Sequence, residues 1–363
     1  MLFKRRSRAD LAGSSLSAEA WRRFRRNPLS VASLVVIGLF ALVAILGYLI
    51  TPDHTPNCNQ QYLELATLKP GSKATFLCVD SPSPITHHSS FFRRMTQGEP
   101  LSYTATPIYS YSIARDSIHV VPIAGEPFGV PAATATVRER TFLLGTDAYG
   151  RDVLSMLMIG SRVSLSVGFI AILIALLIGV TLGALAAYRG GWVDNVIMWL
   201  INVVWSIPTV LLVIAITFAL GKGFWQIFVA VGLTMWVDIA RIVRGEVLSL
   251  REKEYVEATR ALGFSTARTI FRHILPNTVG AIVVVAASNF ASAILLEAGL
   301  SFLGIGVQPP TPSWGMMVKE NYGYILLDSA YLALLPGLAI MIIVLAFMLV
   351  ASGLRDALDT RSA

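Results

Sequence analysis

Residues 165–187 read LSVGFIAILIALLIGVTLGALAA and contain no charged side chain. A helix needs about 20 apolar residues to cross the hydrocarbon core of a bilayer, because each residue adds only about 1.5 Å. This stretch is therefore long enough to cross a membrane. Of the 363 residues in the chain, 55% are hydrophobic and 14% are charged, whereas roughly a quarter are charged in a soluble domain. Together with a mean hydropathy of +0.65, this composition predicts that lipid surrounds most of the chain.

Similar apolar stretches recur along the sequence. The expected membrane helices are Leu29–Leu49, Leu165–Ala187, Val196–Leu220, Phe224–Val243, Val279–Ile305 and Tyr331–Ser352. We expect Pro208 to kink the third of them. Asp238 and Arg241 interrupt the fourth near its end, and being one helical turn apart they are expected to pair with each other. The sequence thus predicts an all-α polytopic membrane protein with six transmembrane helices. The first is expected to be an uncleaved anchor, since no small-residue cleavage site follows it.

Lysine and arginine gather at two places near the ends of these helices. They precede the first helix, as Lys4, Arg5, Arg6, Arg8, Arg22, Arg23, Arg25 and Arg26, and they fill the loop between the fourth and fifth, as Arg244, Arg251, Lys253, Arg260, Arg268 and Arg272. Because basic residues near helix ends mark the cytoplasmic side, we expect both termini in the cytoplasm. A multi-pass membrane protein with both termini on the cytoplasmic side follows. No basic stripe is interleaved with stacking aromatics, so no nucleic-acid partner is expected despite a net charge of +7.

This orientation places residues 51–140 outside the cytoplasm. Their alternating stretches Tyr103–Ile113 and Ile118–Ile123, together with several prolines, indicate a small β-rich insertion. The two cysteines of the chain, Cys58 and Cys78, both lie in it. In an oxidising compartment they are expected to form a disulfide, worth about 3 kcal/mol on chain-entropy grounds, with two buried, reduced thiols as the alternative.

The most informative segment is the coupling loop, residues 252–277, which reads EKEYVEATRALGFSTARTIFRHILPN. Tyr255, Ala258, Ala261 and Leu262 are spaced to form one face of a first short helix. Gly263 is expected to end that helix in a left-handed cap. Ser265 can cap a second helix over Thr266–His273, and Pro276 is expected to end it. The pattern predicts a helix–turn–helix elbow, for which a DNA-binding motif and a plain connector are the alternatives from the residues alone.

The order Glu257-Ala258-Thr259, then Gly263, then Leu275-Pro276 resembles the EAA loop of permease subunits in binding-protein-dependent ABC importers. That motif has an EAA triplet, a glycine four residues beyond its last alanine, and an Ile-x-Leu-Pro ending. This chain departs from it at Thr259, which replaces an alanine, and at His273, which replaces the isoleucine. The peptide-transporting branch of the family commonly shows RHILPN, as residues 272–277 do.

Other stretches resemble the same dipeptide and oligopeptide branch. They are Leu144–Asp147, Gly150–Leu154, Ala240–Leu248, Glu297–Gly304 and Pro312–Gly315. The resemblance runs from about residue 141 to the C-terminus and leaves most of residues 51–140 uncovered. We therefore divide the chain into a cytoplasmic segment (1–28), a first transmembrane helix (29–50), a periplasmic insertion (51–140) and a permease core (141–363) that contains the coupling loop.

The resemblance implies a type I ABC importer permease fold and a role in moving peptides inward by alternating access. The implied partners are a homologous permease in a heterodimer, two ATP-binding subunits, a periplasmic solute-binding protein and membrane lipid. Within that family the coupling loop docks on an ATPase subunit. This chain itself contains no phosphate-binding loop of the Gly-x-x-x-x-Gly-Lys-Ser/Thr type. We therefore expect a non-catalytic subunit with no catalytic residues, cofactor or metal site.

Other transport functions stay open at this stage. A permease for nickel or another small solute is the nearest alternative, and an ion-coupled secondary transporter is a more distant one. The latter would need paired charges near the membrane midplane. Glu297 is the acidic residue to consider, and its place in the sequence favours a polar contact near the periplasmic interface over ion coupling. Asp147, Arg151 and Asp152 are expected to shape the chain just before the second membrane helix.

Overall fold

The computed structural model describes residues 16–80, 90–221 and 223–358. The chain forms two compact units, each of which draws on separate parts of the sequence. The first contains Met1–Gly38, Val167–Leu296 and Met341–Ala363, and the second contains Leu39–Ser166 and Glu297–Ile340.

Five described helices are long and apolar enough to cross a membrane. They are α2 (Pro28–Ile50), α4 (Val153–Arg189), α7 (Phe224–Leu250), the continuous rod Thr266–Phe302 that ends in α10 (Leu275–Phe302), and α12 (Tyr331–Leu358). These helices coincide with five of the six expected ones, although α4 and α7 extend well beyond the apolar stretches that predicted them. The mostly helical architecture is therefore confirmed.

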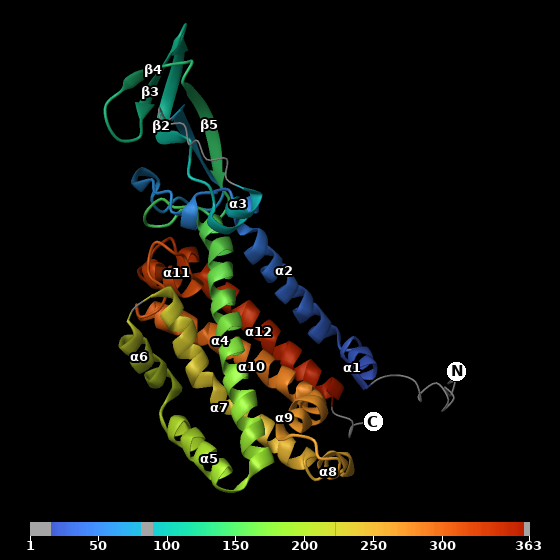
Figure 1. Cartoon of the computed structure of the whole chain (residues 1–363). Helices are drawn as coiled ribbons and strands as arrows, with labels where there is room; N and C mark the ends of the chain where they lie inside the picture. The colour runs from blue at the N-terminus through green and yellow to red at the C-terminus, as the bar shows by residue number, and fades with distance from the viewer. Residues whose placement is uncertain (1–15, 81–89, 222, 359–363) are drawn as a thin grey trace, which may run out of the picture. The chain divides into compact units, whose positions relative to one another are not determined.

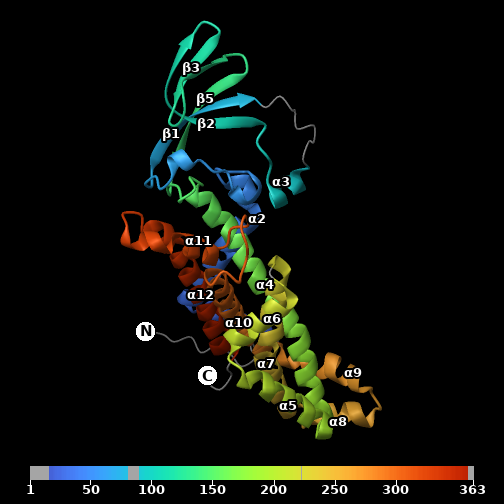
Figure 2. The same ribbon diagram turned by 90° about the vertical axis from the view of Figure 1, so that its left-hand side faces the viewer.

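The third expected helix is not continuous. It consists of α5 (Gly191–Ser206) and α6 (Thr209–Leu220), which are bent by 96° at the break between them and appear as separate rods in both views (Figures 1 and 2). Pro208 disfavours the helical conformation of the residue before it, and Ile207 is accordingly extended, with φ −94° and ψ 128°. The described chain thus has six candidate crossings only if this bent pair counts as one.

Close approach of helices in the first unit depends on glycine. A Cβ atom added at Gly183 of α4 would lie 2.4 Å from the carbonyl oxygen of Ala240 in α7, and one at Gly179 would lie 2.6 Å from that of Trp236. Small residues of this kind let membrane helices pack backbone against backbone. A short helix, α1 (Leu16–Phe24), precedes α2, and its Phe24 is buried against Val350 and Ala357 of α12.

The expected β-rich insertion is present in the second unit. Its strands are β1 (Ser72–Asp80), β2 (Tyr103–Ala114), β3 (Ser117–Pro122), β4 (Phe128–Pro131) and β5 (Ala135–Phe142), and they pair antiparallel in the order β4-β3-β2-β1-β5. Short 3-10 turns at Pro56–Cys58 and Leu63–Leu65 precede the sheet, and α3 (Phe91–Gln97) lies between β1 and β2.

The sheet buries apolar side chains in two clusters. Leu77 of β1 alternates with Phe76 and Cys78 along the strand, so its side chain enters one cluster with Ile108, Ile118, Val120 and Ala135. Phe76 and Cys78 enter the other, together with Tyr62, Leu65, Ala74 and Phe142. Apolar side chains therefore cover both faces of β1, which pairs with β2 on one side and with β5 on the other.

The expected disulfide is not present in this structure. Cys58 and Cys78 are both free and buried. The Cys58 thiol donates to the carbonyl oxygen of Asp53, with 3.1 Å between sulfur and oxygen, whereas Cys78 packs among the aromatic rings of Tyr62, Phe76 and Phe142. The two thiols thus lie in different surroundings, and the reduced alternative describes them.

Candidate functional site: the elbow between α7 and α10

The coupling loop folds into the expected elbow. Its first helix is α8 (Glu254–Ala261), and a Schellman cap ends it. The Gly263 N–H donates to Arg260 O (2.9 Å), and the Phe264 N–H donates to Thr259 O (3.0 Å), which are the two bonds that define this cap. Gly263 has φ +72° and open space around its α-carbon. Glycine is therefore needed here for its backbone conformation and not because a side chain would collide.

Thr259 lies at the contact between the two arms of the elbow. Its side chain is 5% exposed, and its hydroxyl donates to Val256 O (2.6 Å) and accepts from Thr269 Oγ1 (3.4 Å). Thr269 belongs to α9 (Thr266–Thr269), and it is fully buried. The departure from alanine at position 259 thus provides a polar contact that fixes the angle between α8 and α9.

Aromatic stacking closes the turn itself. The rings of Phe264 and His273 are stacked, with centroids 5.6 Å apart, and the Arg268 guanidinium lies 4.1 Å from the centroid of the Phe264 ring. Ser265 caps α9 as expected, because its hydroxyl accepts from the backbone N–H of Arg268 at 3.4 Å. The turn is held by local contacts, which makes the elbow a preformed unit.

Pro276 does not end the second arm of the elbow, contrary to expectation. The helix passes from α9 through a π-helical turn, Ile270–Ile274, directly into α10. Proline in a helix removes one N–H donor and crowds the carbonyl four residues earlier. A wider π turn just before it relieves that crowding, so Leu275 and Pro276 begin α10. The second arm is consequently continuous with a candidate membrane helix.

The side of the elbow that faces away from its own chain carries large apolar groups. Leu262 is 71% exposed, Phe271 64% and Tyr255 41%. Glu257 and Ala258 are exposed beside them. The inner side, in contrast, is buried through Val256, Ile270 and Ile274. Sequence spacing placed Leu262 and Tyr255 on one face of the first helix but did not single out Phe271. The feature that could have revealed Phe271 is that it is an aromatic residue in an otherwise basic segment.

Two contacts join the elbow to the end of α4. Arg251, just before α8, donates from Nη1 to Ala187 O at 2.6 Å. Arg260 of α8 lies over the ring of Tyr188, 5.2 Å from its centroid. These groups and the carboxylates of Glu252 and Glu257 line an open hollow of about 440 Å³. A displacement of α8 would therefore act on α4 as well as on α10.

The residues expected before the second membrane helix form a buried ion-pair network. Arg151 donates from Nε to Asp147 Oδ2 (2.6 Å) and from Nη2 to Glu320 Oε2 (2.6 Å). Glu320 belongs to α11 (Trp314–Asn321), so the network joins α11 to the start of α4. Burial raises the pKa of the Asp152 carboxyl, and hydrogen bonds from Ser155 together with the charge of Arg140 oppose that shift. These residues are structural, as the sequence predicted.

Glu297 and Asp238 have contrasting surroundings. The Glu297 carboxylate is fully buried and accepts from Ser164 Oγ (3.0 Å) and Ser301 Oγ (2.7 Å), so it makes the expected polar contact. Asp238 does not form the expected ion pair with Arg241. In the described part of the chain no basic group lies within 4.0 Å of it, and Arg241 lies instead over the ring of Trp205.

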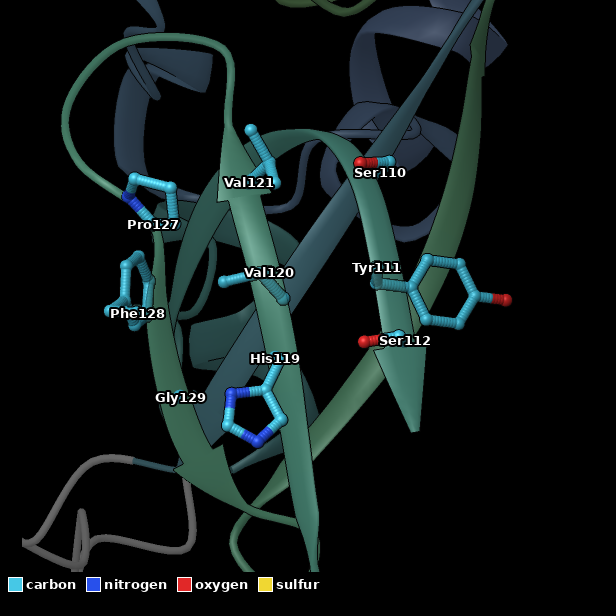
Figure 3. A pocket seen from close by; sticks show the side chains of 9 residues that line it. All are labelled: Ser110, Tyr111, Ser112, His119, Val120, Val121, Pro127, Phe128 and Gly129. Carbon is cyan, nitrogen blue, oxygen red and sulfur yellow. The ribbon is translucent and has the colours of Figure 1, made fainter. Parts of the chain in front are cut away.

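The outer strands of the insertion carry a second surface with exposed aromatic residues. A hollow of about 370 Å³ crosses β2, β3 and β4 (Figure 3), and it is lined by Ser110, Tyr111, Ser112, His119, Val120, Val121, Pro127, Phe128 and Gly129. Figure 3 shows the Tyr111 ring pointing away from β2 at one side of this surface. Tyr109 next to it is 84% exposed and Ile113 is 66% exposed.

Within the residues that the structure describes, no group of three His, Cys, Asp or Glu side chains is arranged to hold a metal ion.

Two family models match the sequence. One, described as "Binding-protein-dependent transport system inner membrane component", matches residues 179–363, and the other, described as "N-terminal TM domain of oligopeptide transport permease C", matches residues 15–70. The first contains the whole elbow. Strands β1 to β5 lie between the two matched regions, so the sheet of the insertion is outside both models, whereas residues 51–70 of the insertion lie within the second.

Several curated proteins are similar over much of their length. The glutathione transport system permease protein GsiD of Pectobacterium atrosepticum is 42% identical over 60% of this chain and 72% of its own. The dipeptide transport system permease protein DppC of Bacillus subtilis is 42% identical over 60% and 68%, and OppC of the same organism, an oligopeptide transport system permease protein, is 40% identical over 60% and 71%. Among solved structures, an inward-facing MetNI methionine ABC transporter superposes with a TM-score of 0.46 at 20% identity, covering 56% of this chain and 95% of that one.

Proposed function

We propose, because the chain belongs to the family of binding-protein-dependent transport system inner membrane components, that it is the permease subunit of an ATP-driven peptide importer. In this proposal it works by alternating access, together with a homologous permease, two ATP-binding subunits and a solute-binding protein. The named relatives that transport dipeptides, oligopeptides and glutathione support peptides as the substrate class.

The observation that carries the ATP-driven part of the proposal is the exposed apolar side of the elbow. Leu262, Phe271 and Tyr255 expose 71%, 64% and 41% of their surfaces although they belong to an elbow whose turn is held by a Schellman cap. Buried anchors of this kind supply most of the binding energy at a protein interface. We assign this side of the elbow to an ATP-binding subunit, with Glu257 and Arg268 at the rim, where charges set orientation.

The contacts of the elbow give the docked subunit a route to the membrane helices. The second arm continues into α10 without a break, and Arg251 and Arg260 contact the end of α4. Movement of the docked subunit would thus be passed to two helices at once. In this proposal the elbow and both termini are cytoplasmic and the insertion is periplasmic, which the distribution of basic residues supports.

Substitution of Gly263 tests the proposal. We expect Gly263→Trp to abolish ATP-driven uptake of labelled trialanine in proteoliposomes that contain all partners, because φ +72° is costly for a bulky side chain and the new ring would lie beside the docking surface. Gly263→Asn is the matched control, since asparagine tolerates this conformation, and it should keep most of the uptake. Normal uptake and a normal yield of complex with Gly263→Trp would refute the proposal.

The same preparation separates this proposal from its main rival. An ion-coupled transporter would move solute along an ion gradient without any ATP-binding subunit. Uptake by the purified chain alone, driven by a proton or sodium gradient, would therefore support the rival. If uptake needs ATP and the partners but accepts nickel and rejects peptides, the assignment as an ATP-driven importer stands and the substrate is nickel.

A further inference from the structure

Helix α7 presents a charged side chain to its surroundings within a candidate membrane helix, near the end of the apolar stretch Phe224–Val243. Asp238 is exposed, and α7 continues for about 20 Å on either side of it. Placing an aspartate against lipid at the centre of a membrane helix costs about 2.5–3.5 kcal/mol. The carboxylate is therefore expected to face water or protein in the assembled transporter.

The rest of the same helix face is also unsuited to lipid. From Asp238 the exposed positions continue through Ile242, Gly245 and Ser249, which are spaced to lie on one side of a helix. The exposed positions of α2 and of α12 up to Met348 are apolar and include Leu34, Val35, Leu39, Leu42, Leu334, Leu338, Met341 and Leu345, whereas polar exposed positions of α12 begin only at Ser352. One chain thus carries both kinds of surface, and the polar one is on α7.

Asp238 and Arg241 are held apart although they are one turn from each other. The Arg241 guanidinium stacks on the ring of Trp205 in α5, 3.8 Å from its centroid, and its Nη1 is buried without an acceptor among the described residues. A mutual ion pair would neutralise both groups at little cost. Among the described residues, stacking on Trp205 leaves no cation within 4.0 Å of the Asp238 carboxylate and no anion within 4.0 Å of the Arg241 guanidinium.

We infer that Asp238 and Arg241 bind the two terminal charges of a peptide as it crosses, a step that rests on the proposed function. Asp238 would accept from the terminal ammonium, and Arg241, oriented by Trp205, would donate to the terminal carboxylate. Side chains three residues apart on a helix are about 5–6 Å apart at Cβ, and two extended residues span at most about 7 Å. A dipeptide, or a tripeptide bent so that its two ends approach each other, can therefore contact both side chains, whereas a single ion can contact only one.

Thiol labelling tests whether Asp238 faces the path of the peptide. In the complete importer, Asp238→Cys should react with a water-soluble cationic methanethiosulfonate at least tenfold faster than Val35→Cys, an exposed apolar position of α2. Binding protein loaded with trialanine, in the presence of ATP, should slow that reaction about fivefold. An unreactive cysteine, or one that the peptide does not protect, would overturn the inference.

Uptake measurements test the charge itself. Asp238→Asn should lower trialanine uptake about tenfold, which corresponds to about 1.4 kcal/mol, while the copurified partners and the ATP hydrolysis without peptide stay unchanged. Asp238→Glu should restore most of the uptake. Glu246→Gln, an exposed carboxylate of the same helix, is the matched control and should behave as the unmodified chain.

The outcomes separate this inference from the proposed function. If the unmodified importer shows ATP-driven trialanine uptake that Asp238→Asn leaves intact, only the inference fails. If Asp238→Asn instead prevents the homologous permease from copurifying, the charged face belongs to a subunit interface and the inference is wrong. If the unmodified importer takes up no peptide with ATP, the proposed function itself fails.

Discussion

Glu297 is a buried carboxylate that joins three segments of the second unit. Ser164 of α4 and Ser301 of α10 donate to it, and Ser313, which caps α11, contacts it as well. Removing the acceptor costs about 1–3 kcal/mol for each buried hydroxyl group that is left without a partner. We expect Glu297→Ala to lower the thermal unfolding midpoint of the purified protein clearly and Glu297→Gln, which keeps one acceptor oxygen, to lower it less. Equal midpoints for all three proteins would contradict the structural role.

The two cysteines provide a chemical prediction at the same scale. Burial raises the pKa of the Cys58 thiol, and the charge of Asp53 raises it further; burial also raises the pKa of Cys78. At pH 8 each thiol is therefore less ionised than an ordinary cysteine, so both should resist iodoacetamide in the folded protein. After unfolding without any reductant, mass spectrometry should find two added alkyl groups. A protein that takes up none until it is reduced would contain the disulfide after all.

At the scale of elements, Arg151 holds α11 against the start of α4. The side chain is 5% exposed, and it bridges Asp147 and Glu320. Removing one partner of a buried ion pair commonly costs 3–5 kcal/mol, because the remaining charge stays buried, so Arg151→Ala should lower the unfolding midpoint strongly or abolish expression. Arg138→Ala removes an exposed arginine of β5 and should change the midpoint little. Similar midpoints for the two variants would contradict this account.

Prolines show where sequence patterns succeed and fail for these elements. Apolar length alone located α2, α4, α7, α10 and α12, because burial in lipid demands it. It could not tell that Pro208 would separate α5 from α6 by a 96° bend while Pro276 would be accommodated after a π turn. The difference depends on whether the helix before the proline can widen into a π turn or must end. That is a property of the local packing and not of the proline.

The elbow shows the same limit for the candidate site. Its position, its glycine cap and its serine cap followed from the residues, and the family resemblance that gave them meaning is confirmed by the matched family model. The exposure of Leu262 and Phe271 did not follow, because both sides of α8 and of the following turn carry apolar residues. Only the structure shows that Val256 and Ile274 turn inward and leave the others uncovered.

At the scale of the whole molecule, the sheet of the insertion lies in residues 71–178, which neither family model covers. It is an ordered five-stranded sheet with its own apolar clusters, and its outer strands expose Tyr109, Tyr111 and Ile113. Exposed aromatic clusters commonly mark protein interfaces. If the insertion is periplasmic, the solute-binding protein is the partner that this surface would meet.

Replacing the two tyrosines tests that contact without disturbing the fold. Tyr109 is 84% exposed and Tyr111 49%, so the double change to alanine should leave the unfolding midpoint almost unchanged, as surface substitutions usually do. Loss of one or two aromatic anchors costs about 2 kcal/mol or more at an interface. The concentration of loaded binding protein that gives half of the full stimulation of ATP hydrolysis should therefore rise at least tenfold. Phe92→Ala in α3, which is 67% exposed, is the matched control and should keep full stimulation. A contact that carries binding energy cannot be removed without weakening the complex. If the double variant keeps full stimulation, and if the chain without residues 60–135 keeps full transport, the insertion is therefore not a docking surface.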